Sequence, residues 1–595
     1  MIRQNQEEWW QKHGANYWTL YPYQPTDAQK KIIYESVMAY EKGYRKIVIH
    51  AGVGLGKSAI ATTLMRIFEE SYILTKDTHL QDQYVEDYSE YLTELKGRPH
   101  YHCHYGGSCD KCYIHYVNEY KTPNLAVRLK LLNTHGRHFE FAHPLDEIFD
   151  GNYIGEKDKA REYWEKISEM KLWYCDDCEY LLARKEAKAS NYVIANYHSL
   201  YYNSSIYPFF DKRNSIFFDE CHNIEKLVTD WFSILIKPLD VYEDYEIDVF
   251  EDKSYHDLED IDYWIGIFNE IILKINILEE EEISKFKGIL DDNYLDNIKK
   301  DYAHKRARYQ KFIDLLREDY CVVLPSENDI YDDSVNMITL QPVFAKNLAN
   351  CLFDMGEVCF FLSGTLPNYK QSFNELGVDI NEIYYIYEES PYPEENRPII
   401  FKPLGNFSSR YNHKENGRII YAYEDSNVIS GLIKILNHHS NENIIIFTES
   451  KDQTDYLCDE LYEYNPLPAY EDFKDENIEL FKNEDYNLLI SPSISEGVDF
   501  KGAYCTVQII FKMPYPVPTG RIDYRLNKCK DWDYYNNLVL IKLEQMYGRS
   551  IRGINDQCVT YIVDAAFNNL LKKSIKFSNY FATGLKAGKS ITGDA

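Results

Sequence analysis

The chain contains 595 residues, which is too long for a single hydrophobic core and predicts several domains. Its formal net charge of −30 argues against a general nucleic-acid coat protein, although an enzyme of this charge can still carry a local basic groove. We find no apolar run of about 18 residues and no secretion signal, and therefore expect a cytoplasmic protein with no membrane partner.

A glycine-rich loop near the N-terminus is the first informative segment. The apolar run at 47–49 predicts a strand, the loop occupies 51–58, and a helix is expected over 59–70. This order is typical of a P-loop, whose backbone N–H groups surround the phosphates of ATP. The residues expected to bind phosphate through their backbone are Gly52, Val53, Gly54, Leu55 and Gly56.

Two side chains complete the predicted P-loop. Lys57 would reach the β and γ phosphates, and the Ser58 hydroxyl would hold Mg²⁺. Ala51 occupies the place where the strict pattern has its first glycine, so a chance glycine-rich turn is the alternative interpretation. Upstream, Gln29 lies in a helix expected to start near Thr26. Its amide could read an adenine edge, although a plain surface glutamine is the commoner case.

A group of cysteines follows, and it predicts a metal site. Five of the 13 cysteines lie between 103 and 178, namely Cys103, Cys109, Cys112, Cys175 and Cys178. Two CxxC pairs could form a four-thiolate zinc site, and the same thiolates with Cys103 could hold an iron–sulfur cluster. The spacing alone does not separate these two metals. The other cysteines are scattered and are expected to be small core residues.

The alternation of strands and helices resumes with strands predicted near 192–195 and 216–218. The second of these strands is followed by two carboxylates. Asp219 would hold the Mg²⁺ shell, and Glu220 would orient or deprotonate the attacking water. His222 could sense the γ-phosphate and connect the site to a second domain. An ordinary acidic turn is the alternative, but the position downstream of a P-loop favours the catalytic interpretation.

The middle and the second half of the chain differ in character. Residues 226–335 read as amphipathic helices with acidic faces, and the strand at 358–362 precedes a Ser-Gly-Thr turn at 363–365. That turn is a candidate coupling motif or a plain turn. From 385 to 595 a second α/β unit is expected. Its strands are predicted near 444–448, 488–490 and 507–511.

Two further motifs lie in this second unit. The segment 495–500 follows a strand, and its Glu496, Gly497 and Asp499 suit a hinge that touches nucleotide and nucleic-acid backbone. The pattern at 545–552 has Gln545, Gly548, Arg549 and Arg552 at spacings that share one helical face. The two arginines could then act as arginine fingers on a neighbouring domain's nucleotide. A solvated basic helix face is the alternative.

Taken together, these motifs resemble those of the iron–sulfur DNA helicases of superfamily 2, the XPD/DinG family. The resemblance rests on KGRPHYHC at 96–103, CEYLLARKEAKASNYVIANYHSL at 178–200, DECHNIE at 219–225, LSGTLP at 362–367, SPYP at 390–393, SEGVDF at 495–500, KMPYPVP at 512–518 and QMYGRSIRG at 545–553. Departures from the family pattern are Ala51, Gly364 and the cysteine within DECH, and none of them removes a ligand atom.

The resemblance implies an α/β fold with two RecA-like parallel-sheet motor domains, an inserted iron–sulfur domain and an inserted helical Arch domain. The expected bounds are 1–97, 183–225 and 336–384 for motor domain 1, 98–182 for the iron–sulfur domain, 226–335 for the Arch, and 385–595 for motor domain 2. The acidic Arch puts in doubt DNA contact by its outer face. Loop 75–79, Lys96 and Arg98 are expected to contact DNA phosphates.

The resemblance also implies an activity and cofactors. They are ATP-dependent 5′-to-3′ movement on single-stranded DNA with unwinding of duplex, forked or R-loop substrates, Mg²⁺, and a 4Fe–4S cluster instead of zinc. Cys103 and Cys178 match the first and last cluster ligands. The middle two are Cys109 and Cys112 in the XPD-like pattern, whereas the DinG-like pattern favours Cys175, so four of the five cysteines are expected on the cluster. Expected partners are single-stranded and forked DNA and RNA–DNA hybrid, bound by a monomer in DNA repair or replication.

Three other functions are compatible with parts of the sequence. A DNA-stimulated ATPase could remodel protein–DNA complexes or R-loops without processive unwinding. A redox-sensing DNA-binding protein could use the cluster as a switch, but the P-loop and the 545–552 motif would then be dispensable. A nuclease finds little support, because no further carboxylate-rich domain flanks the motor.

Overall fold

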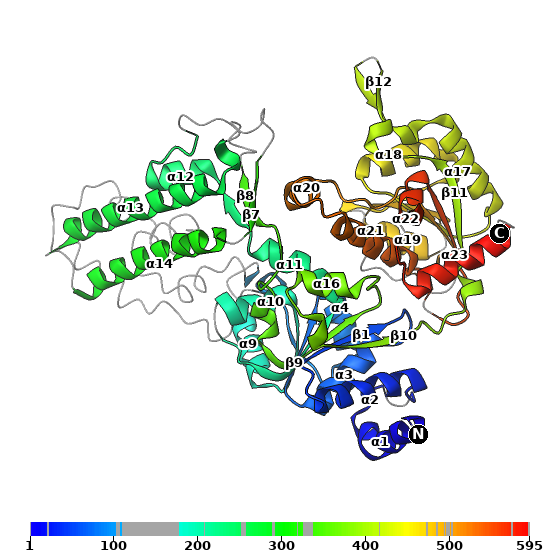
Figure 1. Cartoon of the computed structure of the whole chain (residues 1–595), viewed down its shortest axis with the longest axis horizontal. Helices are drawn as coiled ribbons and strands as arrows, with labels where there is room; N and C mark the ends of the chain where they lie inside the picture. Colours follow the sequence, from blue (N-terminus) through cyan, green and yellow to red (C-terminus); the bar gives the residue numbers. More distant parts are fainter. Residues whose placement is uncertain are drawn as a thin grey trace.

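The fold is that of a computed structural model, and it consists of two α/β units and a helical projection (Figure 1). The structure describes residues 2–20, 23–102, 108–109, 178–206, 209–250, 257–287, 292–317, 319–324, 337–415, 417–471, 474–483, 486–492, 494, 500, 504–551, 553–572 and 575–592. Most of the predicted iron–sulfur domain at 98–182 lies outside these residues.

The first unit is built on a seven-stranded parallel sheet of order β10-β1-β9-β5-β2-β4-β3. Its strands are β1 (Lys46–Ala51), β2 (Ser71–Thr75), β3 (Thr93–Leu95), β4 (Tyr192–Asn196), β5 (Arg213–Asp219), β9 (Gly356–Ser363) and β10 (Ile383–Glu388). The central strands are continuous apolar runs because helices cover both faces of the sheet. The strands predicted near 47–49, 192–195, 216–218 and 358–362 are confirmed.

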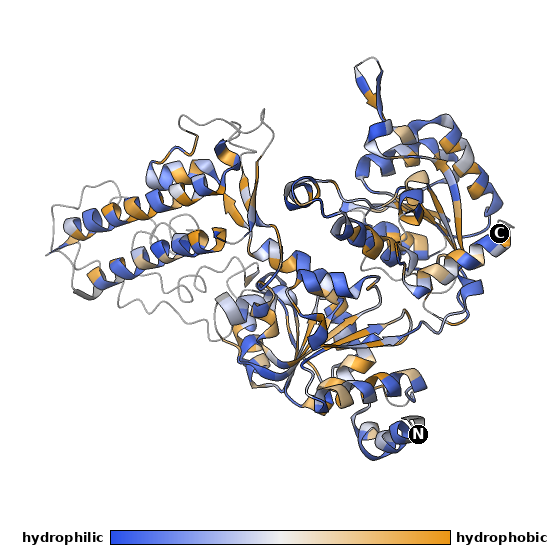
Figure 2. Cartoon of the chain, in the orientation of Figure 1, coloured by the Kyte–Doolittle hydropathy of each residue, from blue (hydrophilic) through white to orange (hydrophobic). Residues whose placement is uncertain are grey.

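The helices of this unit are α1 (Ile2–Trp9), α2 (Asp27–Glu41), α3 (Lys57–Phe68), α4 (Thr78–Tyr88), α9 (Glu179–Ala189), α10 (Tyr197–Tyr201), α11 (Ile224–Trp231), α15 (Asn350–Phe353) and α16 (Tyr369–Glu375). Helix α2 begins where the sequence predicts, because Thr26 and Gln29 form a reciprocal capping box. Figure 2 shows apolar strands inside the unit and hydrophilic residues on the outward helix faces. This pattern places the core on both sides of the sheet.

The second unit has a six-stranded parallel sheet of order β11-β18-β17-β14-β16-β15. Its strands are β11 (Ile399–Gly405), β14 (Ile444–Phe447), β15 (Leu467–Pro468), β16 (Leu488–Ser491), β17 (Val507–Ile510) and β18 (Val559–Asp564). Its helices are α17 (Ser426–His438), α18 (Lys451–Glu460), α19 (Lys474–Lys482), α20 (Gly520–Asn527), α21 (Trp532–Tyr547), α22 (Asn568–Lys572) and α23 (Asn579–Thr592). A hairpin of β12 (His413–Glu415) and β13 (Arg418–Ile420) protrudes from it (Figure 1). Two parallel-sheet motor domains of RecA-like type confirm the predicted fold class.

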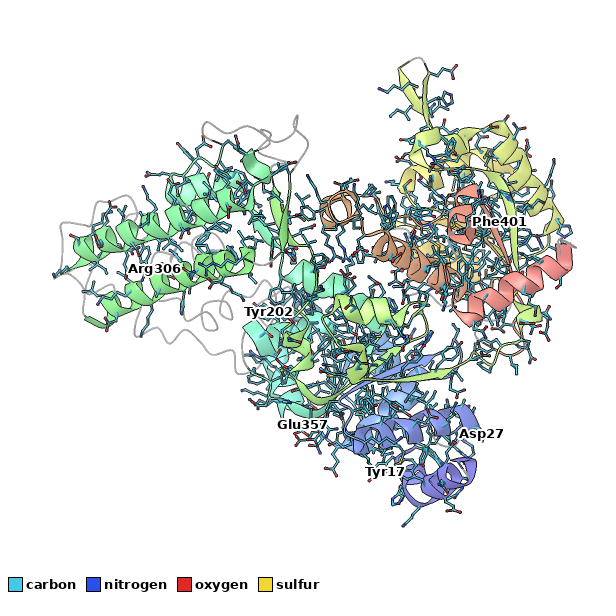
Figure 3. The ribbon with its side chains drawn as sticks, viewed as in Figure 1. Tyr17, Asp27, Tyr202, Arg306, Glu357 and Phe401 are labelled. Carbon is cyan, nitrogen blue, oxygen red and sulfur yellow. The ribbon has the colours of Figure 1, made fainter. Side chains whose placement is uncertain are left out.

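The projection contains α12 (Pro238–Tyr245) and the long antiparallel pair α13 (Ile261–Phe286) and α14 (Asp292–Leu316). Arg306 of α14 (Figure 3) donates to Asn276 of α13 at 3.1 Å and pairs with Glu279, so part of the acidic surface is neutralised between the helices. The helical insertion also has strands at its base, which the sequence analysis does not predict. There β6 (Ile234–Ile236), β8 (Ile338–Pro342) and β7 (Tyr320–Val323) form an antiparallel sheet whose strands are too short for a clear sequence pattern.

One predicted boundary and one predicted helical face also differ from the structure. The division between 384 and 385 falls inside β10, which pairs with β1 along its length, so the first unit extends to Glu388. Helix α21 ends at Tyr547, with Gly548 as its C-cap, so Arg549 does not share a helical face with Gln545. Among the residues that the structure covers, none of the helices combines the length and apolar character that crossing a bilayer requires.

Candidate nucleotide site

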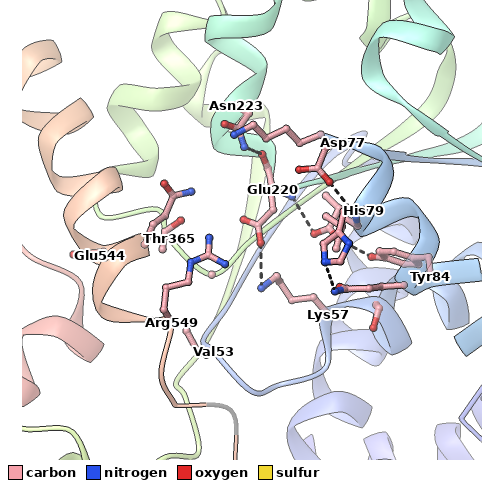
Figure 4. A pocket seen from close by; sticks show the side chains of 18 of the residues that line it. Val53, Lys57, Asp77, His79, Tyr84, Glu220, Asn223, Thr365, Glu544 and Arg549 are labelled. Atoms are coloured by element: carbon pink, nitrogen blue, oxygen red, sulfur yellow. Dashed lines mark hydrogen bonds and ion pairs between the residues drawn. The ribbon is translucent and has the colours of Figure 1, made fainter. Parts of the chain in front are cut away.

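A pocket of about 310 Å³ lies between the two motor domains, where the carboxyl ends of the first sheet meet the end of α21 (Figure 4). It is lined by Val53, Lys57, Ser58, Lys76, Asp77, His79, Leu80, Gln83, Tyr84, Asp87, Asp219, Glu220, Asn223, Gly364, Thr365, Glu544, Gln545, Gly548 and Arg549. Loops after β1, β5 and β9 converge here because parallel strands end at one sheet edge. The structure therefore brings together residues that the sequence places almost 500 positions apart.

The P-loop has the backbone that its glycines predict. Gly54 and Gly56 adopt φ of +87° and +70°, which strongly favour glycine. A Cβ at Gly52 would lie 2.4 Å from the Ser390 nitrogen, so this position also needs a residue without a side chain. Ala51 is the last residue of β1, and its departure from the strict pattern falls on ordinary strand backbone. Lys57 opens α3, whose N-terminus favours an anion.

Gln29 supports the P-loop from below. Its Nε2 donates to the Leu55 carbonyl at 3.1 Å, and its Oε1 accepts from the Thr26 nitrogen at 2.9 Å. The side chain is buried and does not line the pocket. Each amide atom of Gln29 thus makes a contact within the protein, and recognition of adenine by this residue stays a prediction.

The two predicted carboxylates face Lys57 from the end of β5. The Glu220 Oε1 lies 3.7 Å from the Lys57 Nζ, and Glu220 has left-handed backbone with φ of +49°. Such a conformation costs roughly 1–2 kcal/mol in a residue with a Cβ and is commonest at functional sites. Asp219 accepts a hydrogen bond from the Tyr84 hydroxyl at 2.9 Å through Oδ2, which fixes the orientation of its carboxylate.

Burial and the nearby Glu220 charge raise the pKa of Asp219 to about 6, against a partial offset by Lys57. A carboxylate that is buried beside a second carboxylate gains from a bound cation, because the cation supplies the missing opposite charge. The donor set of Ser58, Asp219 and the adjacent Glu220 is of the oxygen type that Mg²⁺ prefers. These residues therefore fit the predicted magnesium ion.

His222 joins three parts of the site. Its Nδ1 lies 2.9 Å from the Ser363 Oγ, and its Nε2 lies 2.6 Å from the Gln545 Nε2. Burial lowers the pKa of His222 to about 4, so the ring is neutral at pH 7 and its Nε2 can accept the Gln545 proton. Gln545 belongs to the second motor domain and the other two belong to the first. This hydrogen bond therefore crosses the domain boundary at the nucleotide pocket.

Arg549 and Lys57 enter the pocket from opposite motor domains (Figure 4). Gly548 lies against the P-loop, since a Cβ at this position would be 3.4 Å from the Val53 Cγ2. This contact places motor domain 2 directly against the P-loop, at an ordinary van der Waals distance. Arg552, Glu496, Gly497 and Asp499 lie outside the described residues.

The predicted metal cluster can be followed only in part, because Cys103, Cys112 and Cys175 lie outside the described residues. Cys109 and Cys178 are buried with their sulfur atoms 3.9 Å apart. Two converging sulfur atoms fit the donor chemistry of a thiolate-held metal group. Within the described part of the chain, no group of three or more His, Cys, Asp or Glu side chains is arranged to hold a metal ion.

Several pocket residues were missed by the sequence analysis. Tyr84 and Glu544 reach the pocket through tertiary packing and belong to no recognisable short motif. Asn223 lies within the quoted segment 219–225, but no role was assigned to it. Lys76 lies in loop 75–79, which was expected to face DNA, and burial lowers its pKa. Of the other residues expected on DNA, Lys96 pairs with Asp82 and Glu94, so it already has acidic partners.

The burial of Glu544 leads us to expect that the stability of the protein depends on pH. Burial raises its pKa to about 7 from the usual 4.5, and its Oε1 accepts a hydrogen bond from the Ser578 nitrogen at 2.8 Å. Because the folded-state pKa is raised, the associated stability is fully present below pH 4.5 and is lost as the pH rises through about 7.

We therefore expect Glu544→Gln to raise the free energy of unfolding by up to about 3 kcal/mol at high pH and to change it little at low pH. Denaturation of the variant, the wild type and an exposed control, Glu460→Gln, at about pH 5 and 8.5 measures this. An equal effect of Glu544→Gln at both pH values would contradict the assignment.

Comparisons with known proteins agree with this architecture. The family described as Helicase C-terminal domain matches residues 411–583, and the DEAD_2 family matches residues 159–241. A probable ATP-dependent helicase of Methanocaldococcus jannaschii is 22% identical, with 94% of each chain covered. The ATP-dependent DNA helicase XPD of Sulfolobus acidocaldarius is also 22% identical, over 61% of this chain and 67% of that protein.

A solved structure titled XPD helicase superposes with a TM-score of 0.56 at 14% identity, covering 92% of this chain and 97% of that one. The chain thus resembles XPD helicases in its overall fold. A second structure, Xpd4 of S. tokodaii, has a TM-score of 0.51 at 14% identity over 93% of this chain and 98% of that one. The shared architecture explains why the nucleotide pocket lies between two parallel sheets. The matched helicase families and the named relatives indicate an ATP-dependent helicase.

Proposed function

We propose that this helicase translocates on single-stranded DNA in the 5′-to-3′ direction and separates duplex, forked or R-loop substrates. The observation that carries the proposal is the nucleotide pocket itself, in which Lys57 of one motor domain and Arg549 of the other line the same cavity. A triphosphate between two cationic side chains from different domains would draw those domains together, and its hydrolysis would release them.

Each residue of the pocket then has a defined task. The P-loop backbone and Lys57 bind the phosphates, Ser58 and Asp219 hold Mg²⁺, and Glu220 orients or deprotonates the attacking water. Arg549 and, by the predicted motif, Arg552 stabilise charge on the transferring phosphoryl group. The neutral His222 connects the phosphate-binding residues to Gln545 of the second motor domain through a hydrogen bond, so a change at the γ-phosphate can move that domain.

DNA is the proposed track because a relative of similar sequence is named an ATP-dependent DNA helicase, and the polarity follows the XPD/DinG resemblance. Because the protein's net charge is −30, we expect sequence-independent DNA binding to use local basic loops that contact phosphates. DNA affinity should therefore fall as the salt concentration rises. We further propose that the protein acts as a monomer in the cytoplasm, because both sides of the pocket come from one chain.

A 4Fe–4S cluster is proposed between Cys103 and Cys178, with Cys109 and Cys178 among its ligands. When bound, it would supply a rigid covalent core to a segment that could then act as a wedge between DNA strands. Cys109 and Cys178 would also anchor that segment to motor domain 1, because both sulfurs lie in its core. Iron and acid-labile sulfide in anaerobically purified protein would support the cluster, whereas a colourless zinc protein would refute it.

Strand displacement on forked DNA tests the proposed activity. Substrates with only a 5′ or only a 3′ single-stranded overhang should give ATP-dependent unwinding for the 5′ overhang alone. An RNA–DNA hybrid with a 5′ DNA overhang tests the wider substrate range. ATP hydrolysis stimulated by DNA without displacement of either substrate would instead identify a remodelling ATPase, and unwinding from the 3′ overhang would overturn the polarity.

A further inference from the structure

Helix α20 contacts three parts of the molecule. It projects from motor domain 2 toward the base of the helical projection (Figure 1). Its first residue, Gly520, has φ of +53°, and a Cβ there would lie 2.7 Å from the Gln341 Oε1 of β8. The Arg521 nitrogen donates to the same oxygen at 3.3 Å. The start of α20 therefore rests on the antiparallel sheet of the projection.

The side chain of Arg521 continues from this contact into motor domain 1. It forms a bidentate ion pair with Glu225 of α11, in which the distance from the Arg521 Nη2 to the Glu225 Oε2 is 3.1 Å. Both side chains are almost buried, with 11% and 12% of their surfaces exposed. The Tyr534 hydroxyl of α21 donates to Glu225 at 3.2 Å. Charge-assisted pairs with this planar geometry restrict orientation as well as distance.

A second arginine fixes α20 on the same domain. Arg525 is 1% exposed and donates through both terminal nitrogens to Glu375 of α16, at 2.6 and 2.9 Å. Its guanidinium also stacks 3.5 Å from the centre of the Tyr534 ring. The helix is thus held by two buried ion pairs, and the Arg525 pair would anchor α20 whether or not the Arg521 pair is present.

Glu225 has a position that distinguishes its pair from an ordinary structural one. It lies in the segment 219–225, which begins with the two carboxylates of the nucleotide pocket and includes His222. Helix α21, which donates Tyr534 to Glu225, also presents Gln545 to His222. The second motor domain therefore contacts the same short segment at two points, at His222 beside the pocket and at Glu225 away from it.

We propose that Arg521 is a positioning residue that couples closure of the nucleotide pocket to the base of the helical projection through Glu225. The inference rests on the proposed DNA-driven function. When DNA draws the motor domains together, the Arg521–Glu225 pair fixes the position of α21 relative to motor domain 1. The positions of Gln545 and Arg549 at the nucleotide pocket follow from this. The contact between the first turn of α20 and Gln341 makes the base of the projection move together with the closing domains.

The first test is ATP hydrolysis by the full chain with and without a single-stranded oligodeoxynucleotide. We expect Arg521→Gln to lower the DNA-stimulated kcat about tenfold, because a small misplacement of catalytic groups has this order of effect. The KM for ATP and the rate without DNA should stay within about twofold of the wild type, since Arg521 does not line the pocket. Lys528→Gln, which removes an exposed charge from the C-cap of the same helix, should leave all rates unchanged.

Further variants separate coupling from folding. Arg521→Lys keeps the positive charge but loses the planar guanidinium that binds Glu225 through two nitrogens. Tyr534→Phe removes one hydrogen-bond donor to Glu225. Both variants should therefore lower the DNA-stimulated kcat by less than Arg521→Gln does. The double variant Arg521→Gln with Glu225→Gln should lose little more than either single variant, because the two residues act as one pair.

Three outcomes would overturn the inference. One is normal DNA stimulation in Arg521→Gln, and another is additive loss in the double variant. The third is a parallel fall of basal rate, stimulated rate and melting temperature in all the Arg521 and Tyr534 variants, which would make the pair merely structural. A wild type that does not respond to DNA would instead refute the proposed function itself, so the two failures are distinguishable.

Discussion

Replacing Lys57 with alanine is expected to reduce ATP hydrolysis by about 10³-fold, the order found when a preorganised charge-stabilising group is removed. Lys57 starts α3, lines the pocket and lies 3.7 Å from Glu220, so its ammonium is placed to contact the phosphates of a bound nucleotide. No other side chain of the P-loop carries a positive charge. The loss should appear in kcat, measured at saturating ATP and Mg²⁺.

The matched control for this prediction is Lys434→Ala, which removes an exposed lysine from α17, far from the pocket residues. It should hydrolyse ATP like the wild type. Lys57→Ala should still bind single-stranded DNA measurably, because its defect is confined to the nucleotide. Unchanged ATP turnover in Lys57→Ala would show that the P-loop is not the hydrolytic site.

Arg549→Ala is expected to lower kcat by about 10³-fold while leaving ATP bound, as for other arginine fingers. The side chain lines the pocket from motor domain 2, so its guanidinium can act on the nucleotide only when the domains are together. Rapid quench of a single turnover, with nucleotide affinity measured separately by a fluorescent ATP analogue, distinguishes a chemical defect from a binding defect.

Two variants sharpen the Arg549 experiment. Arg549→Lys keeps one positive charge but loses the planar fork, and it should recover only part of the rate. Arg410→Ala removes an exposed arginine from the same motor domain and should have no effect. A loss of affinity with normal turnover in Arg549→Ala would assign this residue to binding and would contradict its role as a finger.

The sequence predicted the fold and the nucleotide pocket well where local chemistry decides the structure. Continuous apolar runs such as 216–218 are typical of buried strands in an α/β unit, and Gly54 and Gly56 mark a backbone that favours positive φ. Lys57 and Asp219 lie in one pocket because the parallel strands before them end at one sheet edge, and Gln545 reaches the pocket from α21 of the second motor domain.

The features that were missed depend on tertiary contacts. The three strands at the base of the projection are too short to show a period, and β10 crosses the predicted boundary because its pairing with β1 is set by the sheet. Gly548 ends α21 although the spacing of the motif suits a continuing helix. Neither the Tyr84–Asp219 hydrogen bond nor the Arg521–Glu225 pair joins neighbours in sequence, so no local pattern marks them.

The most direct test of the account is the rate of ATP hydrolysis by the full chain as a single-stranded oligodeoxynucleotide is added at fixed, moderate salt. If closure of the two motor domains around ATP is coupled to a DNA strand, the rate should rise saturably, by roughly tenfold or more, and the rise should vanish in Arg549→Ala. A rate that stays constant up to saturating DNA, although the protein binds that DNA, would contradict the account.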